Sequence, residues 1–190
     1  SSRFFCEIHY CNHPDCIVHR FAGVKNTFDD IERFKGLRTL WHFVISFESM
    51  PLADFCTDFG KIRKRHLQVL NTYFKRLRAC GVEIQSLKVF DLSFEKSMFV
   101  LPHYHFGAIP VGSFKIRKFL FVMQDIRRDM ISRMKVKTLF HFQSFGLKNK
   151  EGVLSYMAKR SAGLYTWRES KKKEYIPSKE GKLLKDILNK

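Results

Sequence analysis

The chain has 190 residues, of which 45% are hydrophobic, and it carries 35 lysine and arginine residues against 18 aspartate and glutamate residues. This length and apolar content exclude a disordered chain and suffice for one domain with its own core, while the longest apolar runs are too short to span a bilayer. The formal net charge of +17 favours a polyanionic partner. We expect nucleic acid rather than a membrane surface, because the cations recur along every predicted helix instead of forming one tail.

The first 36 residues predict a Cys/His-rich zinc-binding appendage followed by a connection. An odd total of five cysteines, three of them within the first 16 residues, fits reduced thiols and a metal better than secreted disulfides. No secretion signal is visible, so we expect a cytoplasmic protein; the chain also has no initiator Met and can be part of a longer protein. The predicted structural zinc ligands are Cys6, Cys11, Cys16 and His19, with His9 and His13 as alternatives.

The remaining elements alternate between strand and helix periodicity. We predict strands at residues 37–47, 82–94, 98–109 and 135–145, long amphipathic helices at 58–81 and 113–134, and a shorter helix at 149–165. Residues 167–190 predict a basic C-terminal extension. The order predicts an α+β fold in which residues 37–166 form an antiparallel sheet of ferredoxin-like, or RRM-like, βαββαβ topology with the helices on one face.

Two histidines interrupt the predicted strand "VLPHYHFGAIP" at residues 100–110. Alternation puts His103 and His105 on the face that the long helices do not cover, where two imidazoles can reach one metal ion. Asp91, on the preceding strand of the hairpin, shares that face and lies opposite His103 if paired residue numbers sum to 194. Two histidines and a carboxylate with open positions suit Mg²⁺ or Mn²⁺ holding a phosphate; Glu95 is the alternative third ligand.

The last predicted helix contains "VLSYMAKRS", which places Tyr156 and Lys159 three residues apart on neighbouring surface. A cation beside a tyrosine favours the phenolate, so Tyr156 is a candidate nucleophile.

"WHFVISF", "LPHYHFG" and "YMAKR", in this order, resemble the three motifs of the HUH endonucleases over about residues 37–165. "PHYHF" is similar to the family's His-hydrophobic-His motif and "YMAKR" to its Tyr-x-x-Lys motif. "WHFVISF" departs from the family in lacking the usual threonines. "FDLSF" resembles the acidic strand of plasmid replication initiators, where the acid is more often glutamate.

This resemblance implies a site-specific single-stranded DNA nickase and strand-transferase that initiates rolling-circle replication in a plasmid- or virus-encoded, prokaryotic setting. It implies that the metal polarises the scissile phosphate, that Tyr156 forms a 5′-phosphotyrosine link, and that Lys159 assists. The expected partner is single-stranded DNA with an origin or element-end hairpin. With one motif tyrosine, termination needs a second subunit, hence a dimer on DNA, or another nucleophile; Tyr165 does not share the helical face of Tyr156.

The predicted DNA-contacting residues are cations on two helices and an aromatic that can either stack on bases or pack in the core. They are Lys61, Arg63, Lys64, Trp41 and Arg160. Three alternatives stay open: a single-strand transposase with the same motifs, a non-catalytic RRM-like nucleic-acid-binding protein, and a zinc-dependent regulator. No phosphate-loop motif of a helicase is present in the sequence.

Overall fold

The computed structural model describes residues 14–33, 39–95, 99–146, 150–158, 165–166 and 174–175. Its main sheet and helices are, in chain order, α1 (Pro14–Arg33), β1 (Thr39–Ser46), β2 (Met50–Pro51), α2 (Leu52–Ala79), β3 (Glu83–Glu95), β4 (Phe99–Val111), α3 (Ile116–Met134), β5 (Leu139–Gly146) and α4 (Lys150–Ala158). A separate two-stranded pairing joins β6 (Tyr165–Thr166) to β7 (Glu174–Tyr175). The predicted α+β class is confirmed. Among the described helices, none has the length and apolarity needed to cross a bilayer.

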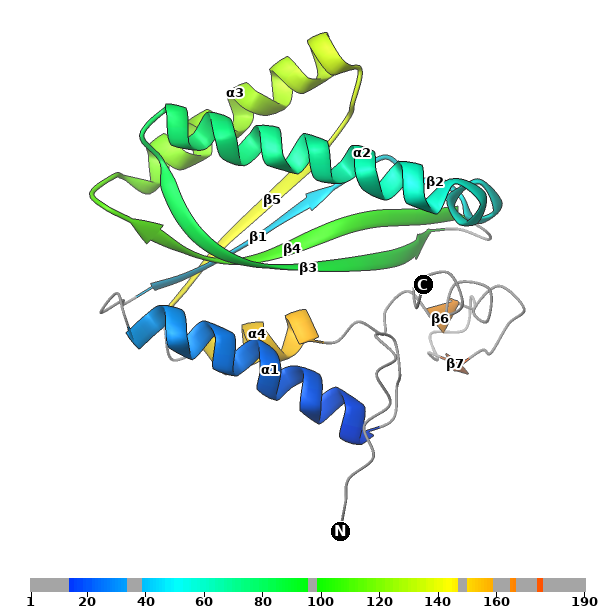
Figure 1. The fold of residues 1–190 in the computed structure, drawn as a ribbon, viewed down its shortest axis with the longest axis horizontal. Coiled ribbons are helices and arrows are strands. Elements are labelled where there is room, and N and C mark those ends of the chain that lie inside the picture. Colours follow the sequence, from blue (N-terminus) through cyan, green and yellow to red (C-terminus); the bar gives the residue numbers. More distant parts are fainter. Residues whose placement is uncertain are drawn as a thin grey trace.

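The sheet is antiparallel and curled (Figure 1). β4 pairs with β3 along one side, and with β1 and the short β2 along the other, while β1 also pairs with β5 at the edge. The long β3–β4 hairpin follows from the alternating apolar pattern of both segments. Gly81, with φ of 67°, ends α2 in the left-handed conformation that glycine adopts without strain, and so allows β3 to turn back.

The main core lies between the sheet and helices α2 and α3. α2 buries residues spaced three or four apart, as its sequence pattern predicts, including Val69, Tyr73 and Leu77. They pack against sheet residues of alternating position, among them Phe43 and Phe106, whose rings stack at a centroid distance of 4.7 Å. This face of the sheet is therefore the one that the two long helices cover.

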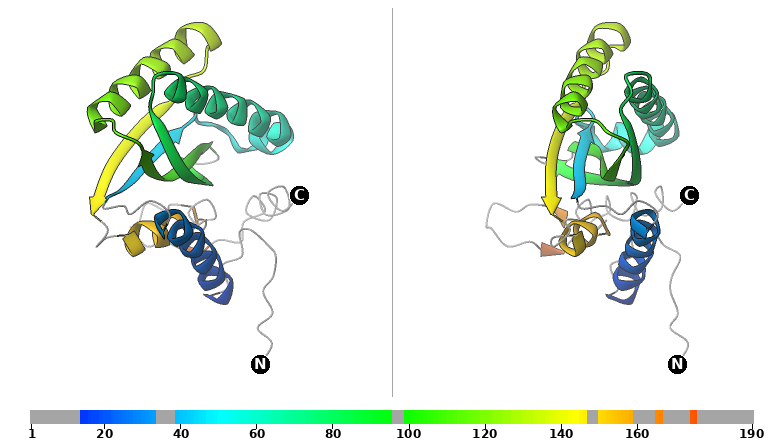
Figure 2. Two further views of the ribbon diagram at one scale, coloured as in Figure 1. Left: turned by 60° about the vertical axis from the view of Figure 1, so that its left-hand side comes forward. Right: turned by 90° about the vertical axis from the view of Figure 1, so that its left-hand side faces the viewer.

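The opposite face of the sheet is not open, contrary to the prediction that the helices lie on one face. α1 and α4 lie side by side beneath it (Figures 1 and 2). A second apolar cluster joins Leu40 and Val89 of the sheet to Leu154 of α4, and Phe21 of α1 packs against it. The reason is that residues 14–33, interpreted as appendage and connection, form one long helix with an apolar stripe.

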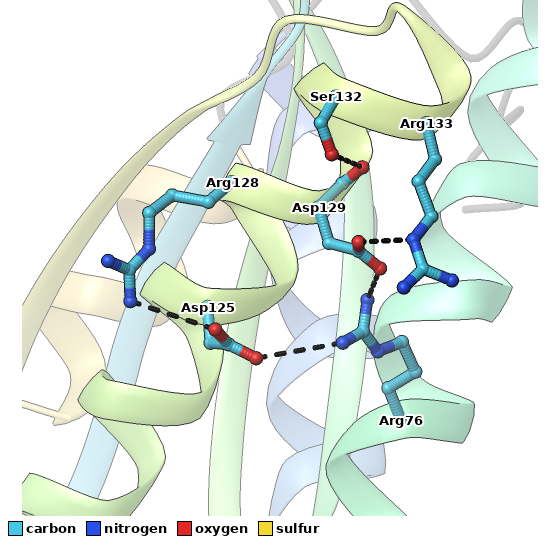
Figure 3. Close-up of polar contacts among 6 residues, drawn as sticks. All are labelled: Arg76, Asp125, Arg128, Asp129, Ser132 and Arg133. Carbon is cyan, nitrogen blue, oxygen red and sulfur yellow. Dashed lines mark hydrogen bonds and ion pairs between the residues drawn. The ribbon is translucent and has the colours of Figure 1, made fainter.

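An ionic cluster ties α2 to α3 (Figure 3). Arg76 of α2 donates a hydrogen bond to Asp129, and its second terminal nitrogen lies 3.6 Å from Asp125 Oδ2. Arg133 and Arg128 contact the same two carboxylates from within α3, the former at 2.6 Å. The arginines thus neutralise both aspartates and fix how the two helices that cover the core lie against each other.

Candidate metal centre

The β3–β4 hairpin brings three ligating side chains together. Asp91 pairs directly with His103, so the predicted register is confirmed, and His105 follows two residues later on the same face. Asp91 Oδ2 lies 3.7 Å from His103 Nε2 and 3.9 Å from His105 Nε2. One ligand atom of each residue lies within 4.8 Å of the others, and all three side chains are buried. This group could hold a metal ion.

The second nitrogen of each imidazole has a hydrogen-bond partner that sets the ring's orientation. His103 Nδ1 lies 3.1 Å from the Leu101 carbonyl oxygen, so it donates there. His105 Nδ1 lies 3.1 Å from His42 Nε2. When both Nδ1 atoms carry the proton, both Nε2 lone pairs are directed toward Asp91, which is the arrangement that metal-binding histidines adopt.

His42 is a member of the site that the sequence did not single out. It belongs to β1, and its ring lies edge to edge with that of His105, with centroids 5.3 Å apart and planes 10° from parallel. Alternation in "WHFVISF" puts His42 on the face opposite to Trp41, which could have suggested a third histidine on this side of the sheet. The pairing of β1 with β4 that brings it beside His105 joins residues more than 60 positions apart in the chain.

Burial keeps these imidazoles neutral at physiological pH. It lowers the pKa of His105 to about 3, helped by the neighbouring His103 and His42 rings. Burial likewise lowers the pKa of His103 and of His42. Asp91 is held from the other side, because its Oδ1 accepts a 2.9 Å hydrogen bond from the Leu92 backbone N–H. A neutral imidazole is the form that binds a metal, so the histidines are in the protonation state that a metal centre requires.

The helix that carries the predicted nucleophile packs on the same face of the sheet as this group. α4 contains Tyr156 and buries Leu154 and Met157 in the second apolar cluster. Gly107, two residues beyond His105, lies so close to Met157 that a Cβ there would be 3.1 Å from its sulfur. The absence of a side chain at residue 107 therefore permits α4 to approach the strand that holds both histidines. The Tyr156 side chain, Lys159 and Arg160 lie outside the described residues.

The remaining predicted site residues fall in three groups. Among the zinc candidates, Cys6, His9, Cys11 and His13 lie outside the described residues, as does the side chain of Cys16, whereas His19 is exposed on α1. Glu95 is paired in β3, but its side chain is not among those described. Among the DNA candidates, Lys61, Arg63 and Lys64 are all exposed on α2. These three cations lie on the helix layer that covers the opposite face of the sheet from the metal candidates.

The prediction that Trp41 stacks on DNA bases was wrong. Its side chain is 5% exposed and packs in the main core against Phe119, with ring centroids 5.0 Å apart. Phe114, just before α3, and Phe142, on β5, contact the ring edge-on. Trp41 therefore stabilises the sheet–helix interface, because alternation directs it toward α3 while His42 is directed to the other face.

Compared with known proteins, the chain matches no protein-family model, no curated protein and no solved structure at a significant level. Its function must therefore be inferred from the residues and their geometry.

Proposed function

We propose that this protein is a metal-dependent endonuclease that nicks and rejoins single-stranded DNA through a tyrosine, in the manner of the HUH endonucleases. The observation that carries the proposal is that the Asp91–His103–His105 group and the helix containing Tyr156 lie on one face of the sheet. The strand pairings also support a ferredoxin-like βαββαβ arrangement for residues 39–146.

The ligand set favours a divalent cation that binds phosphate. Two neutral imidazoles and one carboxylate supply three protein ligands and leave positions for phosphate oxygens and water, which suits Mn²⁺ or Mg²⁺. The separations of 3.7 and 3.9 Å between Asp91 Oδ2 and the two Nε2 atoms exceed hydrogen-bonding distance, so the three groups converge without closing on one another. When bound, the ion would neutralise charge on the scissile phosphate.

In the proposed reaction the Tyr156 oxygen attacks phosphorus. The new bond between the tyrosyl oxygen and phosphorus forms as the bond from phosphorus to the 3′ oxygen breaks, which leaves a 5′-phosphotyrosine and a free 3′-OH. The tyrosyl proton is lost and the leaving oxygen gains one, so the step balances without an oxidant or reductant. Lys159 would position the phosphate, and attack of a 3′-OH on the phosphotyrosine rejoins a strand.

His42 would act by orienting His105. When His105 Nδ1 donates the hydrogen bond that joins it to His42 Nε2, the Nε2 atom of His105 is left free to be the metal ligand. His103 obtains the same effect from the Leu101 carbonyl. Each metal-binding imidazole therefore has one dedicated partner, one of them a side chain and the other the backbone.

The test uses metal binding and covalent adduct formation as two separate measurements. Mn²⁺ titration followed by electron paramagnetic resonance should show one bound ion that is lost in His105→Ala. His141→Ala is the matched control, because His141 is an exposed histidine on β5 of the same sheet. Absence of Mn²⁺ and Mg²⁺ binding by the wild-type protein would refute the metal centre.

The second measurement incubates the protein with labelled single-stranded oligonucleotides, including a pool of hairpins, and Mn²⁺. A labelled adduct that survives denaturing electrophoresis is expected, and it should disappear in Tyr156→Phe but persist in Tyr165→Phe. An adduct that persists in Tyr156→Phe would move the nucleophile elsewhere. Tight DNA binding that EDTA does not change, with no adduct for any oligonucleotide, would favour the non-catalytic nucleic-acid-binding protein instead.

A further inference from the structure

A pocket of about 200 Å³ lies on the other side of the sheet from the metal candidates. Three segments meet there: the connection that follows β1, the middle of α2, and the connection between α3 and β5. The residues that line it are Phe47, Glu48, Met50, Ile62, Arg65, His66, Lys135, Val136 and Lys137. The volume is below the roughly 300–1,000 Å³ of pockets for drug-sized ligands, so a small group fits it best.

Cations surround the pocket while its floor is aromatic. Arg65, Lys135 and Lys137 face one acidic residue, Glu48. The only ion pair recorded among these described residues, Lys137 with Glu48 at 3.7 Å, is solvent-exposed and hence weak. Beneath them the rings of Phe47 and His66 stack, with centroids 3.7 Å apart and planes 15° from parallel.

Lys135 has a backbone conformation that favours glycine. Its φ of 53° and ψ of 34° are left-handed, and it is the one residue other than glycine with positive φ in the described part of the chain. The position caps the C-terminal end of α3, where glycine is the commonest residue because it has no Cβ to strain. A lysine at this position therefore costs stability but supplies a charge at the pocket.

The pocket lies at the same end of β1 as the metal candidates. Ser46, the last residue of β1, pairs with His103, and the next residue, Phe47, donates a 2.9 Å backbone hydrogen bond to the Pro102 carbonyl. The Phe47 side chain packs in the core that α2 and α3 cover, whereas His103 shares by alternation the face on which Gly107 contacts Met157 of α4. A polyanion that passes this end of the sheet can contact both sides.

We propose that this pocket binds one phosphate group of a single-stranded nucleic acid, which Arg65, Lys135 and Lys137 hold. The identity of the polymer rests on the proposed function, whereas the phosphate chemistry rests on the pocket alone. Phe47 and His66 are 4% and 5% exposed and stack on each other, so they close the bottom of the pocket while the cations supply its polar contacts. Three cations around one small pocket suit a phosphate of an unpaired strand. The contact would add to affinity and to its salt dependence.

Lys135→Gly is the decisive variant, because its effects on stability and on binding have opposite signs. It removes the charge and also relieves the left-handed strain, so the melting temperature should stay equal or rise. Fluorescence anisotropy with labelled (dT)12 in EDTA should show affinity reduced by about tenfold. The slope of log affinity against log salt should become shallower by about 0.7, the value for one lost phosphate contact to a single strand. Arg65→Gln should weaken binding similarly.

Lys75→Gln is the matched control, since Lys75 is an exposed lysine on α2 that does not line the pocket. An equal loss of affinity in this control would overturn the proposal, because any cation would then serve. Unchanged (dT)12 binding in Lys135→Gly would overturn it too. So would a Lys135→Gly variant that binds dTMP more weakly but (dT)12 as tightly as the wild type, because the pocket would then bind a free nucleotide. The measurement needs no metal, so it can succeed while adduct formation fails, and the reverse.

Discussion

His66 should make the protein less stable as the pH falls from 8 to 5. Its side chain is 5% exposed, on α2 against Phe47 and Tyr104, and burial together with the nearby Arg65 charge lowers its pKa from 6.5 to about 4. The unfolded chain therefore takes up a proton near pH 6.5 that the folded chain refuses until about pH 4. The stabilisation is complete above pH 6.5 and is lost as the pH falls toward 4.

The size of the effect follows from the separation of the two pKa values. The difference between 6.5 and about 4 corresponds to about 3 kcal/mol once both states are protonated. Between pH 8 and pH 5 the loss amounts to about 2 kcal/mol of the free energy of unfolding. This is a large share of the roughly 5–15 kcal/mol that stabilises a typical domain.

The assay is urea unfolding followed by circular dichroism at several values of pH from 8 to 5. His66→Phe keeps a ring against Phe47 and removes the titrating group, so its stability should depend less on pH than that of the wild type by about 2 kcal/mol over this range. His66→Gln should flatten the dependence by the same amount, whatever it costs in packing. Buried histidines elsewhere contribute equally to all three proteins. Parallel curves for wild type and both variants would refute the reasoning.

Four further predictions concern buried polar groups and the candidate metal centre. Tyr73→Phe should lower the free energy of unfolding by about 1 kcal/mol, because the Tyr73 hydroxyl hydrogen-bonds Thr138 at 2.7 Å. Tyr104→Phe should raise the free energy of unfolding by about 1 kcal/mol in the same urea assay, because the Tyr104 hydroxyl is buried with no hydrogen-bond partner among the described residues. His42→Leu should weaken Mn²⁺ binding about 10–100-fold in calorimetry, with His42→Gln recovering part of the affinity through its amide oxygen. Mn²⁺ at 100 times its dissociation constant should stabilise the wild type by about 2.7 kcal/mol, an increment that EDTA removes and that Asp91→Asn reduces.

Local patterns predicted the β3–β4 hairpin and the grouping of Asp91, His103 and His105 correctly. Alternation fixed which residues of β4 share a face, and a short turn limited the register, so Asp91 could be assigned opposite His103. The helical spacing of α2 likewise predicted its buried side. In each case the information lay within a few residues of the chain, where sterics and periodicity act directly.

Features that depend on long-range pairing were missed. His42 reaches His105 only because β1 pairs with β4, and the residues around His42 do not indicate which strand β1 pairs with. Trp41 was expected on the surface because an isolated tryptophan in a basic protein suggests base stacking, yet the core of α3 encloses it. The cysteines and histidines near the start of α1 suggested a metal-binding appendage, whereas the apolar spacing of the same helix packs it against the sheet.

The geometry also explains why a buried strand contains two histidines. Two imidazoles and a carboxylate on a sheet face that α1 and α4 cover lose hydration, and hydrophobic residues there would stabilise the fold more simply. The hydrogen bonds that the three ligands make with the Leu101 carbonyl, the Leu92 N–H and the His42 ring offset part of that cost and orient the ligand atoms. A bound cation would offset much of the rest, since it interacts with all three groups at once. Burying these three polar side chains destabilises the fold unless they bind a cation, which is why we propose a functional role for them.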